Sequence, residues 1–140
     1  MPRQVRCDFQ PATYAAVIDK YGDLEPYVTI RAAEQRHADA LTRQLERLGV
    51  DAPDNAYLGT LQAPGDLIAA AKAGVANEIA NIRRYDTLLT QTTDASLTRV
   101  LTNLRRASET AHLPMFEAAA DSDGTLTEQE MTDLGFGGGH

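Results

Sequence analysis

The stretch YVTIRAAEQRHADALTRQLERLGV, residues 27–50, predicts a long amphipathic helix. Its apolar side chains recur every three or four residues and so form one stripe along the predicted helix. Glu34 and His37 lie in the middle of that stripe. Because a carboxylate is rarely buried unless it is paired or bound to a metal, this E-x-x-H tetrad indicates a metal-ligand pair.

A second E-x-x-H tetrad runs from Glu109 to His112, although the chain has three histidines in all. Between the two tetrads, Glu78 interrupts the apolar stripe of another predicted helix. Positions three apart lie on one face of an α-helix, so each tetrad would present its pair to one side. We therefore expect Glu34, His37, Glu78, Glu109 and His112 to line one shared interior.

Helix signals dominate the chain, and no segment shows the period-two alternation of a β-strand. Asp94 is a candidate N-cap, and Pro114 should kink the last long helix near His112. The segment 51–64 is rich in Pro, Asp, Asn and Gly and predicts a loop. The predicted fold class is all-α, a four-helix bundle with a shortened first helix and a C-terminal acidic turn plus short helix. The shortened first helix is predicted at about residues 11–22, and the three long helices at about 26–49, 65–91 and 96–120.

Length and composition limit the classes of protein to consider. A chain of 140 residues suggests a single bundle domain, and a net charge of −7 argues against nucleic acid as the main partner. The single cysteine, Cys7, cannot form an intramolecular disulfide. No apolar run approaches the ~20 residues of a membrane-spanning helix, so we expect a cytoplasmic protein without a membrane partner.

Three segments resemble an uncharacterised prokaryotic ferritin-like family and, more broadly, rubrerythrins and bacterioferritins. They are YVTIRAAEQRHADALTRQLERLGV, GVANEIANIRRYDTLL and LRRASETAHLPMFE. The resemblance covers roughly residues 12–118 and implies a ferritin-like fold. It also implies a centre of two iron or two manganese ions, because such bundles combine two E-x-x-H helices with further glutamates. The implied metal ligands are Glu34, His37, Glu78, Glu109 and His112.

The start of the chain departs from that family, because the segment before Tyr14 contains no glutamate. Asp8 and Cys7 are the candidate ligands there. The alternatives are a ligand from another subunit, or no ligand at this position, which would leave a mononuclear or asymmetric site. A homodimer would cover the side left open by the short first helix. The tyrosines would either flank the site as hydrogen-bond or radical partners or act as ordinary core aromatics, and they are Tyr14, Tyr27 and Tyr85.

The resemblance implies a centre that reacts with O2 or H2O2, as an oxidase, a peroxidase or a ferroxidase. The competing hypothesis is a non-catalytic bundle with an incomplete or relic metal site, acting as a binding or structural module. A bundle without metal would instead bury Glu34 and Glu78 in salt bridges to arginine. The candidate partners for those salt bridges are Arg31, Arg83, Arg84 and Arg105.

The C-terminal tail follows the spacing of a calcium-binding EF-hand loop. However, Ala119 occupies the first position, where the loop needs an aspartate, so the sequence favours an acidic turn with Thr127 capping a short helix. We divide the chain into a bundle, residues 1–118, and a segment 119–140 that ends in a flexible glycine-rich tail. The residues that would bind calcium weakly are Asp121, Asp123, Thr125 and Glu130.

Overall fold

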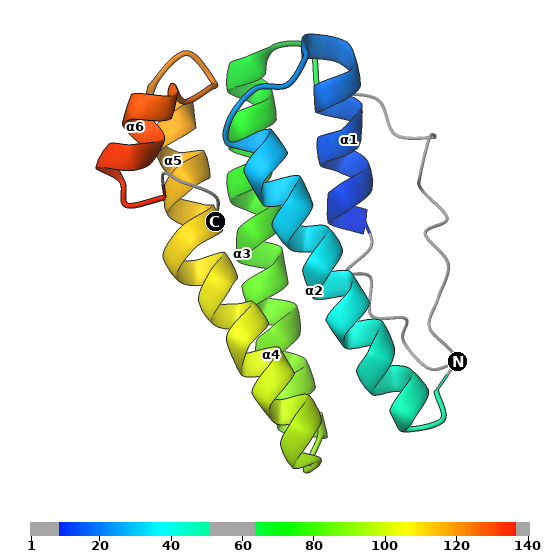
Figure 1. Cartoon of the computed structure of the whole chain (residues 1–140). Coiled ribbons are helices and arrows are strands. Elements are labelled where there is room, and N and C mark those ends of the chain that lie inside the picture. The colour runs from blue at the N-terminus through cyan, green and yellow to red at the C-terminus, as the bar shows by residue number, and fades with distance from the viewer. Residues whose placement is uncertain (1–8, 51–63, 137–140) are drawn as a thin grey trace.

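The computed structural model describes residues 9–50 and 64–136, and every regular element in them is helical (Figure 1). The elements are α1 (Phe9–Tyr21), α2 (Tyr27–Arg47), α3 (Leu67–Gln91), α4 (Ala95–Ala107), the π-helical turn η1 (Ser108–His112), α5 (Leu113–Asp121) and α6 (Glu128–Asp133). The all-α prediction is confirmed. The predicted loop at 51–63 and the glycine-rich end at 137–140 lie outside the described residues.

The long helices form a bundle in which α4, η1 and α5 follow one another as a single rod (Figure 1). This rod packs lengthwise against α3, while α1 packs on α2 and α2 packs on α4. No helix in the described part of the chain is long and apolar enough to cross a membrane.

Local sequence signals explain where these helices begin and end. The Asp94 side chain accepts a hydrogen bond from Leu97 N at 2.9 Å, which confirms the predicted N-cap of α4. Asp66 caps α3 in the same way through Ala69 N. After α1, Gly22 takes a φ of 98°, a conformation that glycine adopts without strain.

Residues 108–112 of this rod form a single π-helical turn, which is wider than an α-helical turn and ends two residues before Pro114. Leu113 N donates to Ser108 O, five residues back, as in a π-helix. Proline has no N–H to donate and its ring collides with the preceding turn of a regular helix. The predicted distortion near His112 therefore takes the form of a π-helical turn.

A layer of buried polar side chains divides the core into two apolar clusters. The upper cluster centres on Tyr14, Tyr27, Ile30 and Phe116, all at most 1% exposed. The lower cluster consists of buried Leu41, Tyr85, Leu101 and Leu104. The polar side chains between them are Glu34, Glu78 and His112, together with Asn81 and Ser108.

The C-terminal segment folds back onto the upper end of the bundle. Leu126 N donates to Glu25 O at 2.7 Å, and the Tyr27 hydroxyl donates to Gly124 O at 2.7 Å. Thr127 and Glu130 form a reciprocal capping box at the start of α6, which confirms the predicted Thr127 cap. The acidic turn therefore covers the N-terminal end of α2.

Candidate metal centre

Three buried side chains from three different elements converge in the middle of the bundle. Glu34 comes from α2, Glu78 from α3 and His112 from η1, and their side chains are at most 5% exposed. His112 Nδ1 lies 2.9 Å from Glu34 Oε1 and 3.6 Å from Glu78 Oε1. One ligand atom from each residue lies within 4.8 Å of the others. Two ligand atoms about 2.0–2.2 Å from one ion lie at most about 4.4 Å apart, so these contacts fit a single cation.

His37 lies at the edge of this cluster, nearer to the surface. Its Nδ1 is 3.9 Å from Glu34 Oε2, and its side chain is 19% exposed. Its ring stacks on that of His112, with centroids 5.6 Å apart and planes inclined by 23°. The two oxygens of Glu34 therefore face different histidines, which is the arrangement of a carboxylate able to bridge two ions.

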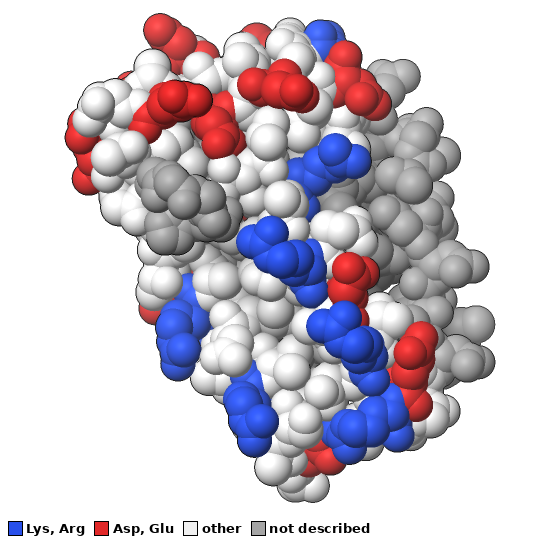
Figure 2. Space-filling model, viewed as in Figure 1, with Lys and Arg blue, Asp and Glu red and all other residues white. Residues whose placement is uncertain are grey.

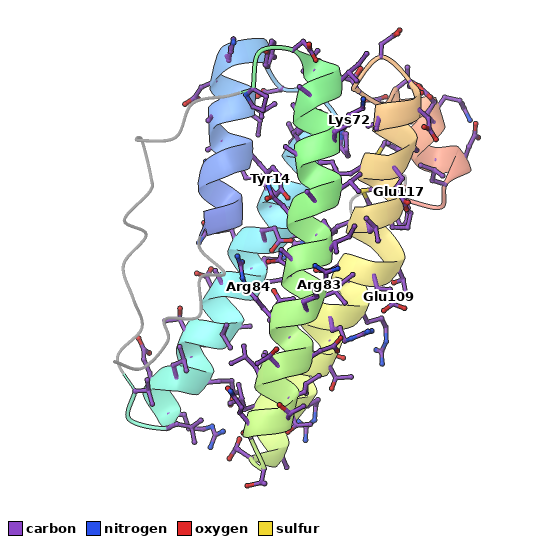
Figure 3. All side chains as sticks on the ribbon, turned by 180° about the vertical axis from the view of Figure 1, so that it is seen from behind. Tyr14, Lys72, Arg83, Arg84, Glu109 and Glu117 are labelled. Atoms are coloured by element: carbon purple, nitrogen blue, oxygen red, sulfur yellow. The ribbon has the colours of Figure 1, made fainter. Side chains whose placement is uncertain are left out.

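The carboxylates of the cluster have partners for only half of their oxygens. Oε1 of Glu34 faces the His112 ring and Oε1 of Glu78 accepts from Tyr14, whereas Oε2 of each is buried without a hydrogen bond. Neither residue forms an ion pair with an arginine among the described residues. Figure 3 shows Arg83 on the outer side of α3, and Arg84 donates to Asn81 Oδ1 at 3.4 Å rather than to a carboxylate of the cluster. Because buried carboxylate oxygens without a partner are costly, the geometry fits a cation-binding site better than a structural salt bridge to arginine.

Tyr14 supports the cluster from α1. Its hydroxyl donates a hydrogen bond to Glu78 Oε1 at 3.3 Å, and its ring packs 5.3 Å from that of Phe116. Burial, followed by the charges of Glu78 and Glu34, raises the pKa of this phenol well above its usual range. Tyr14 therefore stays protonated and remains a donor to Glu78 at physiological pH. By contrast, the Tyr27 hydroxyl is directed to the backbone at Gly124.

Protonation in the cluster reflects burial and the close approach of the carboxylates. Burial raises the pKa of Glu34 to about 7. Burial alone would lower the pKa of His112, but Glu34 and Glu78 outweigh it and raise that pKa to about 9. Burial, with His112 nearby, lowers the pKa of His37 to about 4, so this ring is neutral at pH 7. The cluster without metal thus retains a proton that a cation would displace.

Glu109 does not join the cluster. Its side chain is 49% exposed and pairs with Arg105 on the outer surface, where Figure 3 also shows it. In the wider π-helical turn each residue rotates by less than the ~100° of an α-helix, so Glu109 and His112 no longer share a face. Asp8 and Cys7, the candidate ligands from the start of the chain, lie outside the described residues.

The acidic tail does not gather its side chains around a common point in the described structure. Asp121 and Asp123 are exposed, and Thr125 is half-buried. Glu130 accepts from Thr127 N at 3.1 Å and from Ser122 Oγ at 3.2 Å, so its oxygens already have partners. The acidic turn that the sequence favours accounts for these contacts.

Two further polar side chains of this layer were not predicted from the sequence. Asn81 is 1% exposed and lies three residues after Glu78, and the Ser108 side chain is fully buried four residues before His112. The Ser108 hydroxyl has no hydrogen-bond partner among the described residues. Their helical spacing from the predicted ligands is the signal that could have identified them.

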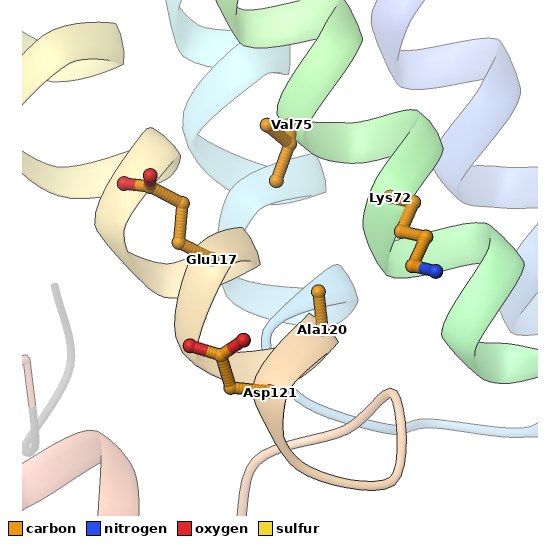
Figure 4. Close-up of a pocket in the computed structure, with 5 residues that line it drawn as sticks. All are labelled: Lys72, Val75, Glu117, Ala120 and Asp121. Atoms are coloured by element: carbon orange, nitrogen blue, oxygen red, sulfur yellow. The ribbon is translucent and has the colours of Figure 1, made fainter.

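A separate surface hollow lies between α3 and α5. Figure 4 shows Lys72 on α3 and Glu117 and Asp121 on α5 around it, with small apolar side chains between them. All three charged residues are exposed. The hollow is open to solvent and its charged groups do not converge on one point, unlike those of the buried cluster.

Comparison with known proteins identifies the fold but no family. No family model and no curated protein matches the chain. A similar solved structure is the crystal structure of hypothetical protein MJ0754 from Methanococcus jannaschii DSM 2661, with a TM-score of 0.73. The match covers 96% of this chain and 87% of that one at 18% sequence identity, so it shows a common fold alone. The helical bundle is supported, whereas the ferritin-like assignment remains a prediction.

Proposed function

We propose that Glu34, Glu78 and His112 bind a divalent transition-metal ion inside a ferritin-like bundle. The observation that supports this most directly is the pair of buried carboxylates around one imidazole, in which Oε2 of Glu34 and Oε2 of Glu78 have no hydrogen bond. A cation would neutralise both carboxylates and satisfy their open lone pairs. A mixed oxygen and nitrogen set of this kind suits Fe(II) or Mn(II).

We extend the proposal to a second ion, with Glu34 as the bridging ligand. Its Oε1 faces His112 and its Oε2 faces His37, at 2.9 and 3.9 Å from the Nδ1 atoms. The neutral ring of His37 offers a lone pair to an ion on that side. The second ion would need further ligands, for which Asp8 is the candidate that the sequence provides.

The function proposed for this centre is the reduction of O2 or H2O2, as in an oxidase, a peroxidase or a ferroxidase. Three protein ligands leave positions on an ion where such a small oxidant would bind. The chain itself contributes orientation and exclusion of water. Tyr14 fixes one oxygen of Glu78, and the apolar clusters above and below close the site to bulk solvent.

An anaerobic Fe(II) titration tests the proposal, with bound metal counted after gel filtration. One or two ions per chain are expected, with a near-ultraviolet charge-transfer band of ferric iron developing after O2 is admitted. Binding without any reaction with O2 or H2O2 would favour the non-catalytic alternative. Failure to bind Fe(II), Mn(II) or Zn(II) would contradict the metal site altogether.

A further inference from the structure

Exposed arginines form two stripes on neighbouring helices, in a chain whose net charge is −7. At ~100° per residue, Arg36 and Arg43 on α2 lie within about 20° of each other around the helix, as do Arg99 and Arg106 on α4. All four side chains are exposed. Figure 2 shows basic side chains along the lower part of this face and acidic ones mostly at its upper end. Basic side chains are thus concentrated on the lower part of this face, with a few acidic ones among them.

The two stripes lie on the solvent-facing sides of two helices, α2 and α4, that pack against each other. Near the lower end of this pair of helices, Arg47 on α2 pairs with Asp94, the N-cap of α4. Higher up, His37 on α2 stacks on His112, which follows α4. These contacts show which side of α2 faces α4, and the arginine stripe of α2 is adjacent to that side. We call the two stripes together, with their four arginines Arg36, Arg43, Arg99 and Arg106, the arginine seam.

The arginine seam includes Arg36, the residue before His37, and His37 is the member of the metal centre nearest to solvent. The side chain of His37 is 19% exposed, whereas those of Glu34, Glu78 and His112 are 1%, 0% and 5% exposed. On the same side of α2, the next turn carries the small residue Ala40, which is half-buried. A partner lying in the seam would therefore come close to His37 without displacing bulky side chains.

The four arginines have no acidic partner within the described part of the chain. The arginines that do form ion pairs there are Arg47 and Arg105. A guanidinium presents a planar fork of donors that matches a carboxylate, and arginine is enriched in protein interfaces. A nucleic acid fits less well, because the rest of the acidic surface would repel its phosphates.

We propose that the arginine seam is the docking surface for an acidic electron-carrier protein, which donates electrons to the metal centre through His37. The electron transfer rests on the proposed function, whereas the docking does not. Each reduced carrier loses one electron and one metal ion passes from +3 to +2, with no transfer of atoms. Two such steps supply the two electrons that convert H2O2 and two protons into two waters.

Binding of the metal-free chain to a small acidic carrier, a [2Fe–2S] ferredoxin, tests the docking. The seam variant is Arg43→Glu/Arg99→Glu, and its matched control is Arg31→Glu/Arg83→Glu, which changes the net charge equally at exposed positions elsewhere. Ferredoxin should bind the unmodified chain more tightly than basic cytochrome c does, and the binding should weaken with salt. The seam variant should bind ferredoxin at least ~10-fold more weakly, and the control within ~3-fold of the unmodified chain.

Several results would overturn the docking proposal. Equal weakening in the two variants would show a general charge effect, and absence of ferredoxin binding would remove the acidic partner. Tighter binding of a duplex oligonucleotide than of ferredoxin at the seam would assign the surface to nucleic acid instead. Self-association that disappears in the seam variant would identify a second copy of the chain as the occupant. Far-ultraviolet circular dichroism checks that both variants are folded.

The electron-transfer step is tested on the iron-loaded, oxidised protein. Reduced ferredoxin should reduce the bound iron at least ~10-fold more slowly in the seam variant, while dithionite reduces both proteins at the same rate. Equal rates with ferredoxin would contradict the route through the seam. If the chain binds no iron, the electron-transfer step fails together with the proposed function, and the ferredoxin-binding result stands by itself.

Discussion

The two E-x-x-H tetrads have the same residue types at the same spacing but different surroundings. In the regular helix α2, Glu34 is 1% exposed and His37 lies beside it in the cluster. In the π-helical turn, His112 faces the interior while Glu109 is 49% exposed on the outer surface. A spacing of three residues gives a shared face only where each residue turns by ~100°. Helix geometry, rather than the tetrad itself, determines which residues converge.

The largest expected difference between the two tetrads is in Fe(II) affinity, when the glutamate of each is replaced in turn. Glu34→Gln should weaken Fe(II) binding by more than ~100-fold, because even loss of an outer partner of a ligand costs 10–100-fold. Glu109→Gln should leave the affinity unchanged, since this side chain pairs with Arg105 at the surface. Anaerobic Fe(II) titration against a competing chelator measures both. Equal losses in the two variants would show that the tetrads contribute alike.

The second prediction concerns His112, the interior histidine of the second tetrad. Its protonation should make the stability of the metal-free protein depend on pH. Burial lowers the pKa of His112, but Glu34 and Glu78 raise it to about 9 overall, above its unfolded value of about 6.5. The native state then holds the proton more tightly. This stabilisation is complete below about pH 6.5 and is lost as the pH rises to about 9.

Urea unfolding of the metal-free protein at several pH values across this window measures the loss. Glu34→Gln should flatten the profile, because it removes the carboxylate nearest to His112. A profile identical to that of the unmodified protein would show that Glu34 does not hold the proton of His112.

Gly74→Ala should disturb the second tetrad more than the first. An added Cβ would lie 2.5–2.6 Å from the ring of Phe116, in the helix that follows His112. Overpacking of this kind costs about 1–3 kcal/mol, and it would shift α5 relative to α3. We expect a lower urea midpoint and weaker Fe(II) binding. Ala73→Gly, on the preceding residue of α3, provides a control for helix propensity without the steric contact.

The smallest effect is expected for the stability of Glu109→Gln. Its ion pair with Arg105 lies at the surface, and Arg105 keeps its second partner, Asp86. Solvent screening limits such a pair to at most about 1 kcal/mol. Urea unfolding in low and high salt measures this contribution. A loss much larger than this would mean that Glu109 stabilises the π-helical turn in another way.

The sequence alone predicted the regular parts of the molecule well. The apolar stripe of residues 27–50 identified α2, and a glutamate within each stripe identified Glu34 and Glu78 as buried. These predictions succeeded because side-chain direction in an α-helix follows from spacing alone. Asp94 was recognisable as a cap for a similarly local reason.

The remaining features depend on three-dimensional context that one sequence does not contain. Pro114 indicated a distortion, but not whether the helix would bend or widen, and so the orientation of Glu109 could not be predicted. The stacking of His37 on His112 depends on how α2 meets the rod. The side on which each arginine stripe would lie likewise required the packing of α2 on α4.

The polar layer has a consequence for cooperativity, because it separates the two apolar clusters. The upper and lower halves of the bundle meet there through buried polar side chains rather than through close apolar packing. Amide hydrogens near Glu34, Glu78 and His112 should then exchange faster than those in either cluster. A cation bound to all three residues would join the halves into one unfolding unit and slow this exchange selectively.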